Sequence, residues 1–211
     1  MYNRKITKMT KIPIKIPMNA IYSRLGRHRH RCEILPEQRR FIEENAQKAF
    51  ELCHFQACYR RCEIVENSGN MITLSSGVTL GSCALAKLLQ NSRAVFLMGA
   101  TAGKELSLAI KQLIADSAGA AALVYDATGS ESVDAVLDYL TDYLKISLAR
   151  RGERLTKNRF SCGYQDLPLS EQGKFYEQLN LADLGVVLSE NFIFEPEKSV
   201  TAIIGIEALC G

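Results

Sequence analysis

The stretch from Glu153 to Asp166 holds the residues whose types and spacing could best bind a charged small ligand. It reads Glu-Arg-Leu-Thr-Lys-Asn-Arg-Phe-Ser-Cys-Gly-Tyr-Gln-Asp. Arg159 can hold a carboxylate through two parallel hydrogen bonds, and Glu153 and Asp134 can offer negative charge to a cation. A ligand with a carboxylate at one end and a positive centre nearby would suit this set. The spacing is equally compatible with a surface loop in which the arginine and the glutamate simply pair.

Residues 151–169, which contain this stretch, are polar and irregular. A long loop inside a compact domain usually has a function, and Gly163 is expected to supply a backbone angle that other residues rarely adopt. The helix predicted just before the loop, over about 131–150, carries Asp134 on the flank of its apolar stripe. We therefore expect Asp134 to lie half-buried at the rim of a cleft beside the loop.

The elements that must position these residues follow from hydrophobic periodicity. Apolar residues three and four apart predict helices, and short β-branched runs between turn residues predict strands. The predicted helices are 36–53, 79–90, 104–117, 131–150 and 170–181, and the predicted strands are 59–66, 71–74, 94–98, 121–125, 185–188 and 199–204. A turn at 126–130 precedes the fourth helix, where Thr128 and Glu131 fit a capping box. We expect a single α+β domain with a twisted mixed or mostly antiparallel sheet flanked by helices.

Positive charge is concentrated at the N-terminus. Residues 1–31 carry nine of the 26 lysines and arginines and none of the 23 acidic residues. We divide the chain into a basic extended arm or edge strand over 1–17, where Pro13 and Pro17 forbid a helix, and a domain over 18–211. A basic arm can bind an anionic partner such as nucleic acid. Because only Tyr2 and Tyr22 offer rings for base stacking there, a solvated tail is the favoured interpretation.

The composition is typical of a soluble globular protein, with 47% hydrophobic and 23% charged residues among 211. No apolar run reaches the roughly 18 residues that a membrane span needs, and no unbroken apolar stretch of a signal peptide follows the basic N-terminus. The seven cysteines are odd in number and scattered through apolar segments, unlike the disulfide framework of a secreted protein. We expect a cytoplasmic protein with no membrane partner.

Two further groups of residues are weaker candidates for chemistry. The segment 99–104, Gly-Ala-Thr-Ala-Gly-Lys, lies between a predicted strand and a predicted helix, where a phosphate-binding loop would be. Glu105 stands where such a loop has a magnesium-binding hydroxyl, so a plain turn is favoured. Cys53, His54, Cys58 and Cys62 lie within ten residues, but their spacing matches no zinc or iron–sulfur pattern, and buried thiols are favoured.

The histidines support no catalytic arrangement. His28 and His30 lie in a basic loop that is more simply solvated than metal-binding, and the third histidine is His54. The sequence also has no nucleophile elbow. We therefore assign no catalytic residue and no metal ligand.

The loop resembles a known family at the residues described above. The motif Arg159-x-Ser161-x-Gly163-Tyr164, followed by Asp166-x-Pro168-Leu169 and Gln172, resembles the activation domain of cobalamin-dependent methionine synthase, most closely its short stand-alone form. Three more segments agree, and they extend the resemblance over nearly the whole chain from about residue 18. They are Ser189-Glu190-Asn191-Phe192 with Pro196-x-Lys198-Ser199-Val200-Thr201, Asp126-Ala127-x-Gly129-Ser130 with Val133-Asp134-Ala135, and Met18-Asn19 through Leu25-Gly26.

This resemblance implies that the protein binds S-adenosylmethionine. By analogy with the family, Arg159 would hold the methionine carboxylate, and the backbone around Ser161 and Gly163 would line the site. Glu153 and Asp134 would lie at or near the ligand. Tyr164 would bind the ligand and face the corrin ring.

The resemblance also implies a role in vitamin B12-dependent methionine biosynthesis. The family restores inactive cobalamin by reductive methylation, using one electron from flavodoxin or a similar donor and a methyl group from S-adenosylmethionine. The chain has no cobalamin-binding signature of its own, so the cobalamin would be carried by a separate methionine synthase or other corrinoid methyltransferase. Such a protein would be a methyltransferase component whose task is mainly positioning, which agrees with the lack of an acid–base constellation.

Two other functions remain open on the sequence. One is a non-catalytic interaction protein of the same fold that has lost the ligand and holds an acidic partner or a nucleic acid through its basic arm. The other is a nucleotide-binding enzyme that uses residues 99–104.

Overall fold

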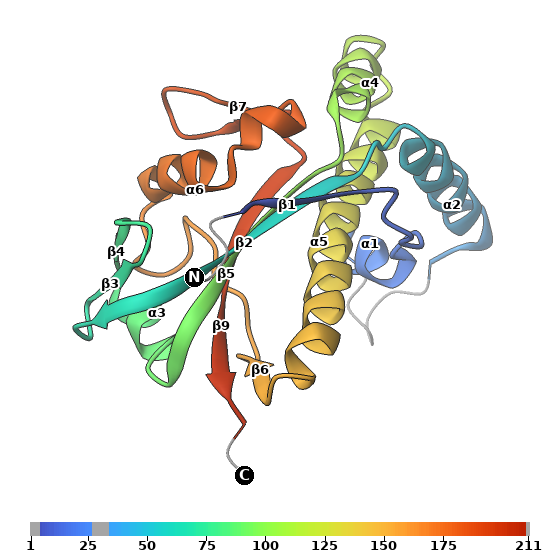
Figure 1. Ribbon diagram of the computed structural model, residues 1–211. Coiled ribbons are helices and arrows are strands. Elements are labelled where there is room, and N and C mark those ends of the chain that lie inside the picture. The colour runs from blue at the N-terminus through green and yellow to red at the C-terminus, as the bar shows by residue number, and fades with distance from the viewer. Residues whose placement is uncertain (1–4, 27–33, 210–211) are drawn as a thin grey trace.

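The computed structural model describes residues 5–26 and 34–209, which form a seven-stranded antiparallel sheet with helices on both faces (Figure 1). The strand order is β4-β3-β2-β5-β9-β6, and β1 also pairs with β2. The strands are β1 (Thr7–Thr10), β2 (Gln56–Asn67), β3 (Met71–Leu74), β4 (Thr79–Gly81), β5 (Ser92–Thr101), β6 (Glu153–Leu155) and β9 (Ser199–Ala208). A separate hairpin joins β7 (Val187–Leu188) to β8 (Phe194–Glu195). The α+β fold with a mostly antiparallel sheet is confirmed.

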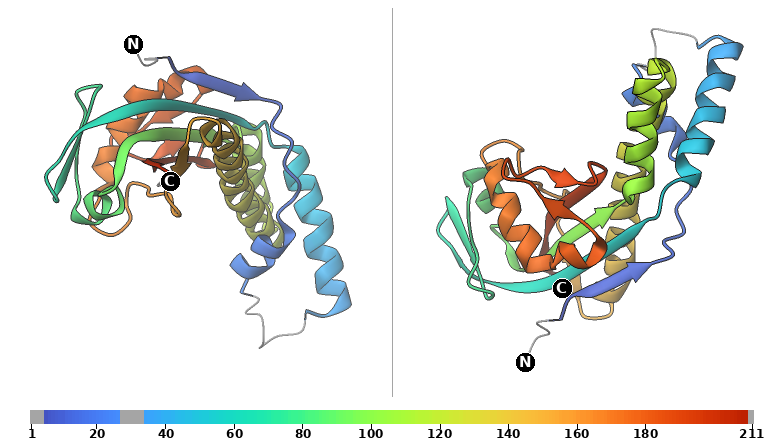
Figure 2. Two further views of the ribbon diagram at one scale, coloured as in Figure 1. Left: turned by 60° about the horizontal axis from the view of Figure 1, so that its bottom comes forward. Right: turned by 90° about the horizontal axis from the view of Figure 1, so that it is seen from above.

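The helices differ greatly in length. They are α1 (Met18–Arg24), α2 (Pro36–Glu51), α3 (Cys83–Leu88), α4 (Lys104–Ala115), α5 (Gly119–Ala149) and α6 (Gln172–Leu179), with short 3-10 turns at Leu169–Glu171 and Leu181–Leu184. The longest, α5, crosses one face of the sheet and extends beyond it (Figure 1). There α1 and α2 lie beside it (Figure 2). No helix in the described ranges is both long and apolar enough to cross a membrane.

Both faces of the central strands are buried, because each face is covered by helices. On β5, Val95 and Leu97 face the cluster beneath α3 and α6, whereas Phe96 and Met98 face the cluster beneath α5. Successive side chains of a strand point to opposite faces, so a continuous apolar run here serves two separate cores. This arrangement explains why the sequence from Ala94 to Met98 has no polar alternation.

The basic arm contributes an edge strand, β1. Of the two possibilities given for residues 1–17, an extended arm or an edge strand, the second is therefore confirmed for Thr7–Thr10. Residues Thr7–Thr10 pair antiparallel with the first part of β2, and β3 pairs with its last part, so β1 and β3 share one side of β2. Lys8 contacts Asp183 at 2.5 Å, and Arg24 contacts Glu131 at 2.5 Å. Part of the positive charge of residues 5–26 is therefore paired with acids of the domain. The histidines of the basic loop, His28 and His30, lie outside the described residues.

The strand predicted over 121–125 is wrong, since these residues belong to α5. A short apolar run cannot distinguish a strand from a buried helix segment by periodicity alone. In the structure Val124 and Ala127 pack against α1 and α2. Thr128 donates its hydroxyl to the carbonyl of Val124 at 2.7 Å, so the predicted turn and the capping box at Thr128 and Glu131 are also wrong.

Three smaller differences concern element boundaries. The helix predicted over 79–90 is a strand, β4, followed by the short helix α3, because Ser82 caps the helix by accepting a hydrogen bond from the amide of Leu85. The strand predicted over 185–188 is limited to β7. The irregular stretch 151–169 contains β6 and a further β-bridge between Phe160 and Ile203.

Gly129 allows a close approach between helix and strand. A methyl group at this position would lie 2.5 Å from Cδ2 of Leu106 on α4 and 2.9 Å from Cγ of Lys198. The glycine expected at a turn is instead a packing residue in the middle of α5. It lets α5 lie directly against the chain that leads into β9.

We predict that Gly129→Ala lowers the free energy of unfolding by about 1–3 kcal/mol, because overpacking outweighs the better helix propensity of alanine. Urea denaturation monitored by circular dichroism measures this change. Gly119→Ala is the matched control in the same helix, since nothing lies within 4 Å of its added methyl group, and equal or slightly greater stability is expected. A Gly129→Ala protein as stable as the control would contradict the packing role.

Candidate ligand-binding site

The loop that carries the candidate residues is attached to the sheet through its backbone. Phe160 and Ile203 exchange two hydrogen bonds, of 2.9 and 2.8 Å, and the amide of Thr156 donates to the carbonyl of Gly205 at 2.9 Å. The hydroxyl of Thr156 accepts from the amide of Gly205 at 3.0 Å. The first half of the loop therefore continues the sheet beyond β6 and has a fixed position along β9.

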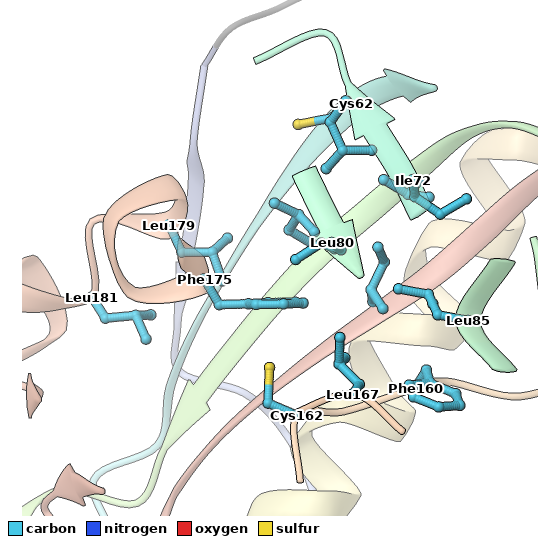
Figure 3. Packing of buried hydrophobic residues seen from close by; sticks show 14 of the residues in the cluster. Cys62, Ile72, Leu80, Leu85, Phe160, Cys162, Leu167, Phe175, Leu179 and Leu181 are labelled. Carbon is cyan, nitrogen blue, oxygen red and sulfur yellow. The ribbon is translucent and has the colours of Figure 1, made fainter. Parts of the chain in front are cut away.

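Side-chain alternation along this segment separates core residues from site residues. Phe160 and Cys162 are buried, and with Leu167 they join the cluster that also contains Leu85 and Phe175 (Figure 3). In an extended segment, neighbouring side chains point in opposite directions. Arg159 and Ser161 consequently face away from this core, toward α5.

A tight turn closes the second half of the loop. Gly163 has a φ of +84°, which L side chains rarely adopt, so the special backbone angle expected at this glycine is confirmed. Its amide donates to the carbonyl of Leu167 at 2.9 Å. The carboxylate of Asp166 accepts hydrogen bonds from the hydroxyl of Ser82 and from the amide of Cys83 at 2.6 Å. These bonds join the turn to the first residues of α3.

An open cleft of about 1180 Å³ separates α5 from the segment 157–161, and α3 lines one end of it. We call it the main cleft. Among the residues that line it are Asp134, Asp138, Arg159, Ser161 and Tyr164. A side pocket of about 250 Å³, lined also by Lys198 and Ser199, shares Asp134, Ser161 and Tyr164 with the main cleft. Four of the six residues predicted from the sequence thus lie around one concavity.

Arg159 spans the main cleft toward α5. Its Nη1 lies 2.6 Å from Oδ1 of Asp138 and 3.2 Å from the hydroxyl of Thr141. The arginine side chain is 23% exposed and that of Asp138 is 70% exposed. The guanidinium therefore lies against a wall of protein, while its partner carboxylate faces water.

Asp134 lies one helical turn before Asp138 on α5. It lines the wall of both the main cleft and the side pocket, as expected at the rim of a cleft, and part of it is exposed to solvent. Partial desolvation by these walls raises the pKa of its carboxyl, and the nearby charge of Arg159 acts in the opposite direction. A cationic group in the cleft would favour the ionised form of Asp134.

Glu153 is not among the residues that line either concavity. Its two carboxylate oxygens accept hydrogen bonds from Arg61 at 2.9 and 2.8 Å. These hydrogen bonds lower the pKa of Glu153. The structure therefore places this predicted site residue in an ion pair that joins β6 to β2. Gly163 shapes the loop between Ser161 and Tyr164, and it too is not among the lining residues.

Sequence reasoning missed three polar residues that contribute to the site. Asp138 and Thr141 hold Arg159, and Lys198 lies in the side pocket, where its ammonium contacts Asp126 at 2.5 Å and the hydroxyl of Ser130 at 3.0 Å. The helical spacing of four residues from Asp134 could have indicated Asp138. Lys198 had no such signal, because its contacts depend on how β9 approaches α5.

The weaker candidates form no comparable site. Cys58 and Cys62 both lie on β2 and are buried, as the sequence favoured. Their spacing of four residues places them on the same face of the strand. Burial raises the pKa of Cys58 to about 12. The segment 99–104 contains the end of β5, a connection of two residues and the first residue of α4, with Gly103 at a φ of +83°. Within the described residues, no group of three or more His, Cys, Asp and Glu side chains is arranged to hold a metal ion.

Comparison with solved structures relates this fold to a MetH reactivation domain crystallised with AdoHcy. The two structures align with a TM-score of 0.61 and 14% sequence identity, over 95% of this chain and 78% of that one. No family model matches the sequence, and no curated protein matches it at a significant level. At this identity the likeness establishes a common fold.

We predict that Glu153→Gln lowers the free energy of unfolding at pH 7 by about 1–2 kcal/mol, between the values typical of exposed and of buried ion pairs. Arg61 holds the pKa of Glu153 below the ordinary 4.5. The wild-type advantage is therefore full above pH 4.5 and disappears as the pH falls through the lowered pKa. Urea denaturation at several pH values measures both effects.

The control for this ion pair is Glu207→Gln, which breaks a contact to the more exposed Arg154 at the same edge of the sheet. We expect it to cost less than about 1 kcal/mol. A wild-type advantage over Glu153→Gln that persisted unchanged at pH 3 would show that the Arg61 pair is not its source.

Proposed function

We propose that the protein binds S-adenosylmethionine in the main cleft and presents it to a cobalamin carried by a separate methionine synthase or other corrinoid methyltransferase. The observation that carries this proposal is the position of Arg159 in the cleft, opposite the carboxylates of α5. The arrangement offers a cation for a carboxylate and anions for an ammonium within one concavity.

The charges of the cleft match the amino-acid end of this ligand. The planar guanidinium of Arg159 suits two-point binding of a carboxylate. Asp134, whose ionised form would be favoured by a neighbouring cation, suits the ammonium. The backbone around Ser161, held by the Phe160 bridge and the Gly163 turn, supplies a fixed wall beside the two charges.

The fold relationship supports the choice of ligand. The structural neighbour was crystallised with AdoHcy, the demethylated analogue of S-adenosylmethionine. Both ligands carry the same amino-acid end, so the same pair of opposite charges would serve either. The alignment covers 95% of this chain.

The chain's own residues would bind and orient the ligand. When bound, S-adenosylmethionine supplies a methyl group made electrophilic by the adjacent sulfonium. Arg159 and Asp134 would fix one end of the molecule, and Tyr164, a residue that is 68% exposed at the cleft, would face the corrin ring of the partner. The electron for reductive methylation would come from a flavodoxin-like or other one-electron donor.

We expect Arg159→Ala to weaken S-adenosylmethionine binding by about 10- to 100-fold, because hydrogen bonds to a charged group contribute about 1.5–3 kcal/mol. Isothermal titration calorimetry measures the affinity, and circular dichroism checks the fold. Arg154→Ala is the matched control, since this neighbouring arginine pairs with Glu207 and is absent from the cleft lining. Its affinity should stay within about twofold of the wild type.

Unchanged affinity in Arg159→Ala would refute the site. Absence of S-adenosylmethionine binding by the wild type, together with steeply salt-dependent binding to nucleic acid or to an acidic partner, would favour the interaction protein instead. The pairing of Lys8 and Arg24 with acids elsewhere in the protein leaves fewer free positive charges among residues 5–26 for such a role.

A further inference from the structure

The guanidinium that would hold the ligand already holds a carboxylate of the protein. Arg159 contacts Asp138 at 2.6 Å, and the side chain of Asp138 is 70% exposed. Ion pairs with one well-exposed partner contribute little to stability, so we expect the fold to tolerate the loss of this contact. Asp138 holds Nη1 of Arg159, so a ligand carboxylate that binds both terminal nitrogens of the guanidinium from the open cleft competes with Asp138 for Nη1.

Replacement of Asp138 changes the charge balance on α5. Asp134 and Asp138 are one helical turn apart and both line the main cleft. Like charges at this spacing repel each other. If a ligand carboxylate takes Arg159, Asp138 loses its partner and stands beside Asp134 without a cation between them.

We infer that Asp138 is a specificity-determining residue that competes with the ligand carboxylate for Arg159 and thereby selects ligands that also carry an ammonium group. This inference rests on the proposed function and extends it. A ligand with a carboxylate alone exchanges one ion pair for another and leaves two unpaired acids. A zwitterionic amino-acid end takes Arg159 with its carboxylate and places its ammonium between Asp134 and Asp138, so it replaces the cation that Asp138 loses.

Among the charged residues that line the main cleft, acidic ones lie only on α5, and only these can therefore bind a ligand ammonium. On the facing wall the charged groups are Lys157 and Arg159, and Lys87 of α3 lies at the end of the cleft. All three are cationic. On α5 the next acid, Asp142, contacts Lys145 at 2.8 Å. Asp134 and Asp138 are therefore the two acids of the cleft left to receive a ligand ammonium.

The test compares two adenosine ligands that differ only in the ammonium group. S-adenosylhomocysteine carries both charges, and its deaminated analogue, with a keto group in place of the amine, keeps the carboxylate alone. Calorimetry on the wild type should show a preference for the zwitterion of about tenfold or more, the effect of about one ion pair in a cleft. In Asp138→Asn and Asp138→Ala this preference should fall at least about fivefold, because the deaminated analogue binds more tightly.

The control variant is Asp142→Asn, which removes the same charge from the next turn of α5 without touching Arg159. Its ligand preference should stay within about twofold of the wild type. An equal loss of preference in Asp142→Asn would mean that general cleft charge, and not competition for Arg159, sets the selectivity.

The remaining outcomes separate this inference from the proposed function. Wild-type binding of S-adenosylhomocysteine with an unchanged preference in both Asp138 variants would overturn the inference alone. Binding that emerges only in the Asp138 variants would support the competition directly. No binding of either ligand by the wild type or by any variant would overturn the proposed function and the inference together.

Discussion

The backbone bridge between Phe160 and Ile203 is the constraint on which the candidate site depends. It fixes the register of the loop along β9, and the register decides which side chains enter the core. A shift by one residue would exchange the two faces. Arg159 and Ser161 would then point into the apolar cluster that now receives Phe160 and Cys162, and the cleft would lose its cation.

The helix α5 supports this arrangement from the opposite side. Its 31 residues contact the sheet through Val136 and Leu140, and α1 and α2 through Val124 and Ala127. The same helix presents the acids of the cleft to the loop. The helix α5 therefore fixes both the position of α1 and α2 and the distance between its own acids and Arg159 across the cleft.

Much of the fold could be predicted from the sequence where one physical signal dominated. The buried strand at 94–98, the short strand at 71–74 and the amphipathic helix starting at Pro36 have strong local patterns, and each forms. The segment 121–125 has no such dominant local pattern. Its apolar residues fit a strand or a helix equally well, and packing against α1 and α2 decides between them.

The site shows the same division between local and tertiary information. The residue types around Arg159 and the special conformation of Gly163 could be predicted, because both follow from the loop itself. The ion-pair partners of Glu153 and Arg159 could not be predicted from the sequence. Glu153 pairs with Arg61, 92 positions earlier in the chain, and Arg159 pairs with Asp138 across the cleft. Only the path of the chain through β2, α5 and the loop brings these charges together.

The short strand β1 has a consequence for how the molecule behaves among its own copies. It forms the outer margin of the sheet beside the first part of β2, and it carries Lys8 between Thr7 and Met9. An incoming strand from another molecule would have to pair beside this charged side chain, whose ammonium contacts Asp183. A lysine in this place thus discourages edge-to-edge growth of the sheet into aggregates.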